Sequence, residues 1–312
     1  MTDTTIEVVD LVLPVAGAAL ALRVHRRAGA GPQPGVVCAG SWLTVKEQMS
    51  DVYAGRLAAK GFTAVSFDFT GFGASGGSLR QTEVPAQKMR DLAAVVDAVS
   101  DWSWVVTGST GVVAVCASAQ YTLGALRRGL PIAWFAAVAG WFHDAASVAP
   151  FYGGEDGVRE KLQQASAAAR RYTETGELNT VAAYAPGDPA AGMSMEMDYY
   201  GNPARGAVPT WTNEMSLLSW PHWLGYDVFH QIDVPGGSDA LARTVPTLLV
   251  HSDDAVLPDN ARAVADRLGE AATLVWTSGE QTDFYDRPAQ VGTAVAAVVD
   301  HARTVLEGRW TP

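Results

Sequence analysis

The sequence predicts an α/β protein whose mostly parallel sheet is covered by helices on both faces. Short, continuously apolar runs alternate along the chain with amphipathic segments of helical periodicity. Continuous apolar strands are typical of parallel sheets buried on both sides. The repeated strand–helix–strand order is typical of the α/β class. With 312 residues, 48% of them hydrophobic, the chain is long enough to bury a sizeable core.

The first two predicted strands differ from the rest. Residues 6–13 and 18–25 alternate apolar and polar side chains and are joined by a short turn at 14–17, which predicts an antiparallel pair. The other predicted core elements are strand 35–40, helix 46–60, strand 62–68, helix 83–99, strand 111–117, helix 118–129, strand 132–140, strand 245–254, helix 260–268, strand 272–278 and a final helix near 288–307. A glycine-rich loop at 70–78 follows the strand at 62–68.

This rhythm is interrupted between the sixth and seventh strands. Residues 141–240 show little strand periodicity, one alanine-rich helix near 157–172, and many Gly, Pro, Met and aromatic residues. We therefore expect an α/β core formed by residues 1–140 and 241–312, with residues 141–240 inserted as a cap.

Composition narrows the classes of function. The formal net charge of −11 disfavours binding to nucleic acid or to an anionic membrane surface. The two cysteines exclude a disulfide framework, and no apolar run reaches membrane-spanning length. The N-terminus lacks the pattern of a signal peptide. We expect a cytoplasmic protein with a small-molecule substrate, no cofactor and no metal site, and the sequence is compatible with a homodimer.

The sharpest local signal is Ala-Val-Cys-Ala-Ser at 114–118, where a predicted strand meets a predicted helix. A nucleophile elbow needs small residues two positions before and after the nucleophile, because strand and helix nearly touch there. Centred on Cys116, those positions hold Ala114 and Ser118; centred on Ser118, one would hold the bulky Gln120. This favours Cys116, and the N-terminus of the following helix is expected to lower the pKa of its thiol and favour the thiolate.

Several motifs occur in an order that resembles the α/β-hydrolase superfamily. They are GVVCAGSW, FDFTGFGASGG, VAVCASAQY, LLVHSDDAVLP and SGEQTDFYD. The resemblance is to the branch of dienelactone-hydrolase-like and polyketide-transferase-like proteins, several of which carry Cys at the elbow. It implies that Cys116 is the nucleophile and Asp254 the catalytic acid. It also implies an oxyanion hole formed by backbone N–H groups of Ser41 or Trp42 and of Ala117.

The chain departs from that family where the catalytic histidine belongs. No histidine lies between His251 and His301, and the expected position falls at Gln281 or Thr282. Neither side chain can act as a general base near neutral pH, so we expect both to line the substrate site instead. His143, directly after the strand at 132–140, is the candidate replacement base, with a structural role at the core–cap junction as the alternative. A bound water network is another candidate.

The aromatic residues of the insertion bear on the substrate. A Met- and Trp-rich wall above the sheet edge suits a bulky apolar acyl group. Trp211, Trp220 and Tyr226 are the candidate substrate contacts, although such residues can equally form the insertion's own core.

Three functions remain open. The first is hydrolysis or acyl transfer, through Cys116 and a non-standard base, of a bulky hydrophobic ester or thioester, including acyl groups linked to a carrier or to coenzyme A. The second is a lyase or cyclase in secondary metabolism that uses the same pocket without a covalent intermediate. The third is a ligand-binding protein without catalysis.

Overall fold

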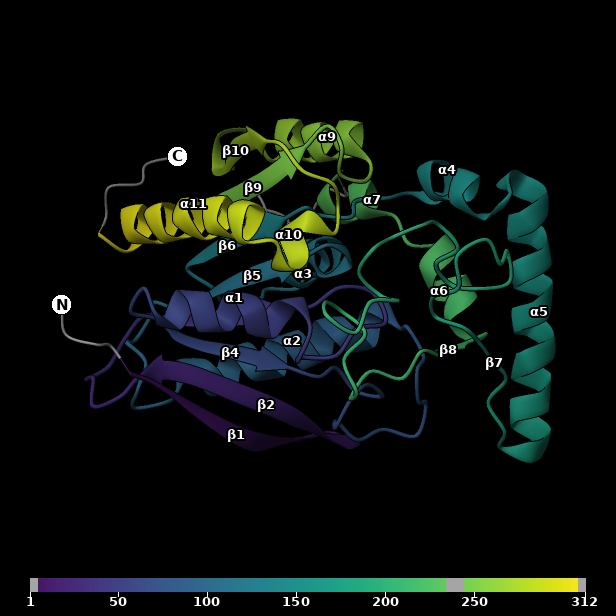
Figure 1. Cartoon of the computed structure of the whole chain (residues 1–312), viewed down its shortest axis with the longest axis horizontal. Coiled ribbons are helices and arrows are strands. Elements are labelled where there is room, and N and C mark those ends of the chain that lie inside the picture. The colour runs from purple at the N-terminus through teal and green to yellow at the C-terminus, as the bar shows by residue number, and fades with distance from the viewer. Residues whose placement is uncertain (1–4, 234–243, 308–312) are drawn as a thin grey trace.

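Figure 1 shows the computed structural model of the chain, which describes residues 5–233 and 244–307. Its central sheet has eight strands in the order β1-β2-β4-β3-β5-β6-β9-β10. They are β1 (Ile6–Val15), β2 (Ala18–Arg27), β4 (Thr63–Phe67), β3 (Gly35–Ala39), β5 (Gly111–Val115), β6 (Trp134–Val138), β9 (Thr247–Ser252) and β10 (Ala272–Thr277). The pairings β1–β2 and β2–β4 are antiparallel and all others are parallel, which confirms the predicted mostly parallel sheet.

Helices cover both faces of this sheet. In Figure 1, α1 and α11 lie on the face towards the viewer, and α2 and α3 lie behind it. The helices of the core are α1 (Met49–Ala58), α2 (Pro85–Ser100), α3 (Ala117–Arg127), α9 (Pro258–Leu268), the short α10 (Asp283–Asp286) and α11 (Pro288–Leu306), with a 3₁₀ turn η2 (Gly269–Ala271).

The apolar patterns are explained by burial. Every residue of β3, β4, β5 and β6 is buried, so these strands have no polar face. The edge strand β1 alternates instead and leaves Val8 and Val12 exposed. At the start of β5, a Cβ on Gly111 would lie 2.0 Å from the ring of Trp134, so only glycine fits beside that indole on β6.

The chain between β6 and β9 lies mostly at one end of the sheet, on the right in Figure 1, but its last described helix packs beside α3 and α9. Its elements are α4 (Ala145–Val148), the 3₁₀ turn η1 (Ala149–Tyr152), α5 (Gly154–Thr175), a two-stranded ribbon of β7 (Thr180–Val181) and β8 (Met215–Ser216), α6 (Ser219–Leu224) and α7 (Val228–Asp233). We call residues 141–233 the insert. The expected boundary at 240/241 falls outside the described residues.

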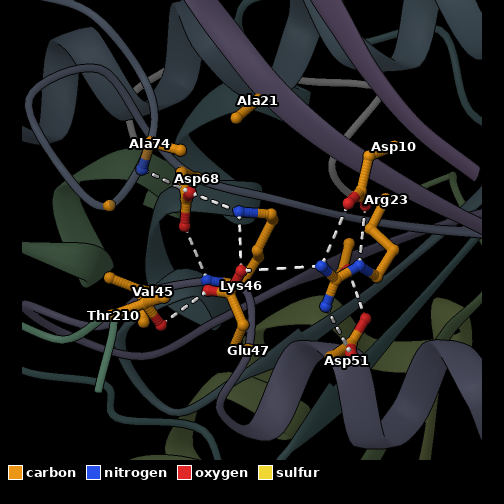
Figure 2. A network of polar contacts seen from close by, with 12 residues as sticks. Asp10, Ala21, Arg23, Val45, Lys46, Glu47, Asp51, Asp68, Ala74 and Thr210 are labelled. Atoms are coloured by element: carbon orange, nitrogen blue, oxygen red, sulfur yellow. Dashed lines mark hydrogen bonds and ion pairs between the residues drawn. The ribbon is translucent and has the colours of Figure 1, made fainter. Parts of the chain in front are cut away.

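A polar network ties the loop after β3 to the rest of the core (Figure 2). The buried carboxylate of Asp68 accepts hydrogen bonds from the backbone N–H of Lys46, at 2.7 Å, and of Ala74, at 2.9 Å. It also pairs with the Lys46 ammonium at 2.9 Å. The same ammonium lies 2.8 Å from the carboxylate of Glu47. That carboxylate also accepts a hydrogen bond from the hydroxyl of Thr210, in the insert. Residues 41–46 are therefore anchored at their C-terminal end.

Among the helices of the described residues, none is both long and apolar enough to cross a membrane.

Candidate active site

Cys116 occupies a strained turn between β5 and α3. Its backbone has φ 56° and ψ −122°, a left-handed conformation that costs a non-glycine residue about 1–3 kcal/mol. The turn is held by backbone hydrogen bonds: Cys116 N–H donates to the carbonyl of Val138 at 3.1 Å, and its own carbonyl accepts from Ala119 and Trp141, both at 3.0 Å. This is the geometry expected of a nucleophile elbow.

The residues two positions to either side explain why the turn fits. Ala114 is fully buried in β5, and Ser118, in the first turn of α3, is 1% exposed. The Ser118 hydroxyl donates a hydrogen bond to the carbonyl of Gly40, the residue that begins the loop after β3. The small side chain at 118 thus joins the elbow to that loop.

The Cys116 side chain lies in the wall of an apolar cavity. The residue is only 5% exposed. Most of the lining is aromatic or thioether: Trp42, Trp141, Phe151, Tyr152, Met193, Met195, Met197, Tyr200, Trp223 and Tyr285, together with Ser41, Gly192, Ser194, Val256 and Gln281. Among the described residues of the lining, tyrosine and cysteine are the only side chains that can gain or lose a proton near the physiological range. Among the described lining residues, Met195 is the most exposed to solvent, at 40%.

Electrostatics at Cys116 favour the neutral thiol. Burial raises the pKa of the Cys116 thiol, and hydrogen bonding from Ser41, Tyr285, the Ala117 N–H and Gln281 offsets only part of that rise. This direction is opposite to the expected stabilisation of the thiolate, because the loss of hydration on burial outweighs these hydrogen bonds. Burial also raises the pKa of Tyr285, so its hydroxyl is a neutral donor beside the sulfur.

Gln281 closes the site where a catalytic histidine was expected. Its amide nitrogen donates to the carbonyl of Ala139 at 2.8 Å and to the Tyr285 hydroxyl at 3.2 Å. Its amide oxygen accepts from the backbone N–H of Val256 at 3.2 Å. Gln281 therefore braces the ends of β6 and β9 against α10, and offers no basic atom. Its neighbour Thr282 is not in the lining; its carbonyl accepts from Arg205 at 2.9 Å.

The predicted oxyanion donors lie beside the sulfur. Ser41 and Trp42 line the cavity, and Ala117 is the first residue of α3, so its N–H has no acceptor within the helix. Apart from its contacts with the Cys116 thiol and the Tyr200 hydroxyl, the buried Ser41 hydroxyl has no hydrogen-bond partner among the described residues. The structure thus brings together Cys116, Ala117, Ser41, Trp42 and Gln281.

The structure does not bring His143 to the cavity. Its imidazole is fully buried between Trp141 and Trp223. The Trp141 indole N–H donates to His143 Nδ1 at 2.6 Å, so the ring proton is on Nε2, which donates to the Trp223 carbonyl at 2.8 Å. Burial lowers the pKa of His143 to about 4. Both ring nitrogens of His143 are engaged in hydrogen bonds, and the imidazole is too weak a base to replace the expected histidine. The other histidines of the chain all lie within the described residues, and none of them lines the cavity.

Asp254 lies in the turn after β9, and its side chain is exposed. Asp254 is not in the cavity lining, and its exposed neighbour Asp253 pairs with Arg262. Among the described residues no histidine lines the cavity, so neither carboxylate has a catalytic imidazole to orient. The turn is at the expected position in the chain, but its carboxylates point to solvent.

The three aromatic residues expected to touch substrate lie behind the cavity wall. The Trp211 indole N–H donates to the carbonyl of Leu43 at 2.8 Å. Trp220 is fully buried against Tyr152 and Trp42, and the Tyr226 hydroxyl donates to the carbonyl of Gln120 at 2.8 Å. The sequence predicted a Met- and Trp-rich wall, but it gave no signal for Tyr200 and Tyr285, which face the sulfur.

No metal centre is evident: within residues 5–233 and 244–307, no three His, Cys, Asp or Glu side chains gather closely enough to hold an ion.

Comparison with known proteins agrees with this architecture. The α/β hydrolase GrgF from Penicillium sp. sh18 superimposes with a TM-score of 0.78 at 16% identity, covering 96% of this chain and 98% of that one. This chain has the α/β-hydrolase fold. The thioesterase domain from the curacin biosynthetic pathway is similar more loosely, with a TM-score of 0.55 at 17% identity over 93% and 99% of the two chains.

By sequence, the chain is 27% identical over 270 residues to the uncharacterized protein YcjY of Escherichia coli (strain K12), covering 81% of this chain and 83% of that protein. No family model matches the chain.

Proposed function

We propose that this protein is an enzyme that accepts a bulky apolar acyl group from a thioester, or from an activated ester, onto Cys116. The observation that carries the proposal is the position of Cys116: a strained turn between strand and helix places its sulfur in an otherwise apolar cavity, beside candidate oxyanion donors. The printed descriptions of similar folds, a hydrolase and a thioesterase, support acyl chemistry.

The proposed covalent step involves only Cys116, the oxyanion donors and the acyl donor. The Cys116 sulfur attacks the acyl carbon, and the developing oxyanion is stabilised by backbone N–H groups of Ala117 and of Ser41 or Trp42. The bond from the acyl carbon to the donor's sulfur or oxygen then breaks, and the thiol proton ends on that departing atom. Thioesters are favoured as donors because a thiol leaves more readily than an alcohol where no residue is poised to protonate it.

Release of the acyl group to water is expected to be slow. Hydrolysis requires a base that activates water, and Gln281 occupies the position where that base was expected. An amine or thiol of a second substrate, or a nucleophile within the acyl chain itself, would then attack the acyl carbon; the bond from that carbon to the Cys116 sulfur breaks, and the proton of the attacking group passes to the sulfur. The reaction is thereby an acyl transfer or a cyclisation, with hydrolysis as a minor outcome.

The lining indicates the class of acyl group. Aromatic and methionine side chains dominate it, and none of its members carries a fixed charge. An uncharged, bulky hydrophobic acyl group fits this wall, and the charged part of any carrier or coenzyme would stay outside. Because Trp141, Phe151, Tyr152, Met193 and Met195 come from the chain after β6, we propose that the insert acts as the cap of the site.

Intact-protein mass spectrometry after incubation with an apolar acyl thioester of N-acetylcysteamine tests the proposal. We expect one acyl adduct on the wild type, none on Cys116→Ala, and an unchanged adduct on Cys38→Ala. Cys38 is the matched control, because it is buried in β3 and absent from the cavity lining. A wild type that forms no adduct with a panel of apolar thioesters would reject the covalent mechanism.

A second candidate follows from the neutral state of the thiol. Cys116 and the hydroxyls of Ser41, Tyr200 and Tyr285 would then act as hydrogen-bond donors that polarise a carbonyl, as in a lyase or cyclase without an acyl-enzyme. This mechanism requires that Cys116→Ala retain measurable turnover of the substrate. A chain that retains ligand but turns over none of the tested compounds would instead be a binding protein.

A further inference from the structure

A buried ion pair lies behind the loop that carries the candidate oxyanion donors. Glu83 and Lys88 approach to 2.8 Å, with side chains 0% and 2% exposed. The Lys88 ammonium also lies 4.6 Å and 4.8 Å from the ring centres of Phe69 and Phe72. Neither residue lines the cavity.

Stability alone does not explain this pair. Removing two charges from water costs several kcal/mol per ion, and apolar residues of similar volume are often as stabilising in such positions. We therefore infer the role of the Glu83 carboxylate from the groups that it contacts.

Glu83 contacts three separate parts of the candidate site. One carboxylate oxygen, Oε2, accepts the backbone N–H of Leu43 at 3.4 Å. The other, Oε1, accepts the hydroxyl of Tyr121, on α3, at 2.7 Å. Its backbone N–H donates to the Ser219 hydroxyl of the insert at 2.9 Å. One residue thus joins the loop after β3, the helix that follows Cys116, and the insert.

Leu43 is a position that needs such support. It follows Ser41 and Trp42 directly and has φ 57°, a left-handed conformation that a leucine adopts only when its surroundings enforce it. Its carbonyl accepts the indole N–H of Trp211 at 2.8 Å, so both polar groups of this residue are held, one by Glu83 and one by the insert. The Thr44 hydroxyl closes the same turn by donating to the Ser41 carbonyl at 2.9 Å.

We propose that Glu83, fixed by Lys88, is a positioning residue that holds Leu43 in its strained conformation and so aims the N–H groups of Ser41 and Trp42 at the reacting carbonyl. Trp211 is the second support. The proposal rests on the proposed acyl transfer to Cys116 and adds the element that sets the oxyanion hole.

The test compares two reactions of the same sulfur. Acylation by a thioester forms an oxyanion, whereas alkylation by iodoacetamide does not. In Glu83→Met/Lys88→Met, which removes both charges and the acceptor for Leu43, we expect the acylation rate constant at saturating thioester to fall at least tenfold. Alkylation of Cys116, measured at the same pH, should change less than threefold, and so should the thioester concentration for half saturation.

Three further variants keep the result interpretable. Glu83→Gln/Lys88→Met retains an acceptor for the Leu43 N–H and should recover acylation to within about threefold of wild type. Trp211→Phe, which removes only the donor to the Leu43 carbonyl, should slow acylation at least threefold while leaving alkylation unchanged. Asp91→Asn is the matched control: this buried carboxylate of α2 accepts from Thr70, away from Leu43, and its loss should leave both reactions unchanged.

Each outcome decides between the claims. If wild type is acylated and Glu83→Met/Lys88→Met is acylated equally fast, the positioning role is wrong and the acyl transfer stands. If both reactions fall together, the pair is structural only. If Glu83→Met/Lys88→Met does not fold, the other two variants decide. The proposal is overturned if Trp211→Phe is acylated as fast as wild type and Glu83→Gln/Lys88→Met is acylated slowly. A wild type that is never acylated overturns the proposed function itself.

Discussion

The pH dependence of Cys116 alkylation is the most direct test of the electrostatics of this site. An ordinary thiol with a pKa near 8.5 is about 3% thiolate at pH 7, and each further unit of upward shift lowers that fraction about tenfold. Burial raises the pKa of Cys116 despite four groups that oppose the rise. We therefore expect the alkylation rate to keep rising beyond pH 9, where an ordinary thiol approaches its plateau.

Iodoacetamide alkylation followed by intact mass gives this profile, with circular dichroism at each pH to show that the fold persists. The assay is carried out on Cys38→Ala so that a single thiol reports. The narrow access to Cys116 lowers the rate at every pH equally and leaves the shape of the profile intact. A plateau at or below pH 8 would show a thiolate stabilised by the start of α3 and would refute the argument that burial dominates.

Four other outcomes follow from the same geometry. Burial lowers the pKa of His143 from 6.5 to about 4. The contribution of the neutral imidazole to folding stability is therefore complete above pH 6.5 and falls by about 3 kcal/mol as the pH drops to 4. Urea unfolding should show this loss of stability in wild type and a smaller loss in His143→Gln. Asp254→Asn should change the acylation rate, followed by intact mass, less than twofold, because that carboxylate is exposed and outside the lining. Met195→Trp, at the most exposed point of the cavity lining, should reduce acylation by long-chain thioesters at least fivefold relative to short ones in a competition assay read by mass. Gln281→His should shorten the lifetime of the acyl adduct at least tenfold if a base is what hydrolysis lacks; an unchanged lifetime would place the barrier elsewhere.

The fold and the elbow could be predicted because both depend on local rules. Continuous apolar strands predicted the parallel sheet, and the small residues Ala114 and Ser118 predicted the turn at Cys116. The order of the motifs placed the missing histidine at Gln281 or Thr282, and of these two only Gln281 lines the cavity. Each of these features is fixed by neighbours in the chain or by the sequence of strands.

The side chains of the insert could not be assigned in the same way. His143 does follow β6 at the expected edge, but its ring turns into the layer between Trp141 and Trp223, a direction that no chain spacing encodes. Trp220 and Tyr226 are as aromatic as Trp223, yet only Trp223 reaches the cavity. Without helical or strand periodicity, the sequence does not distinguish an aromatic residue that faces substrate from one that packs behind it.

The same burial that weakens Cys116 as a nucleophile also protects what it would form. A neutral thiol in an apolar wall attacks only an activated carbonyl, but the resulting thioester sits where water is scarce and where Gln281, held by Ala139 and Val256, cannot activate it. A charged base in this position would speed the attack and would hydrolyse the intermediate as well. In the proposed mechanism, a fixed amide at position 281 therefore slows hydrolysis of the acyl-enzyme and favours transfer of the acyl group to a stronger nucleophile than water, such as an amine or a thiol.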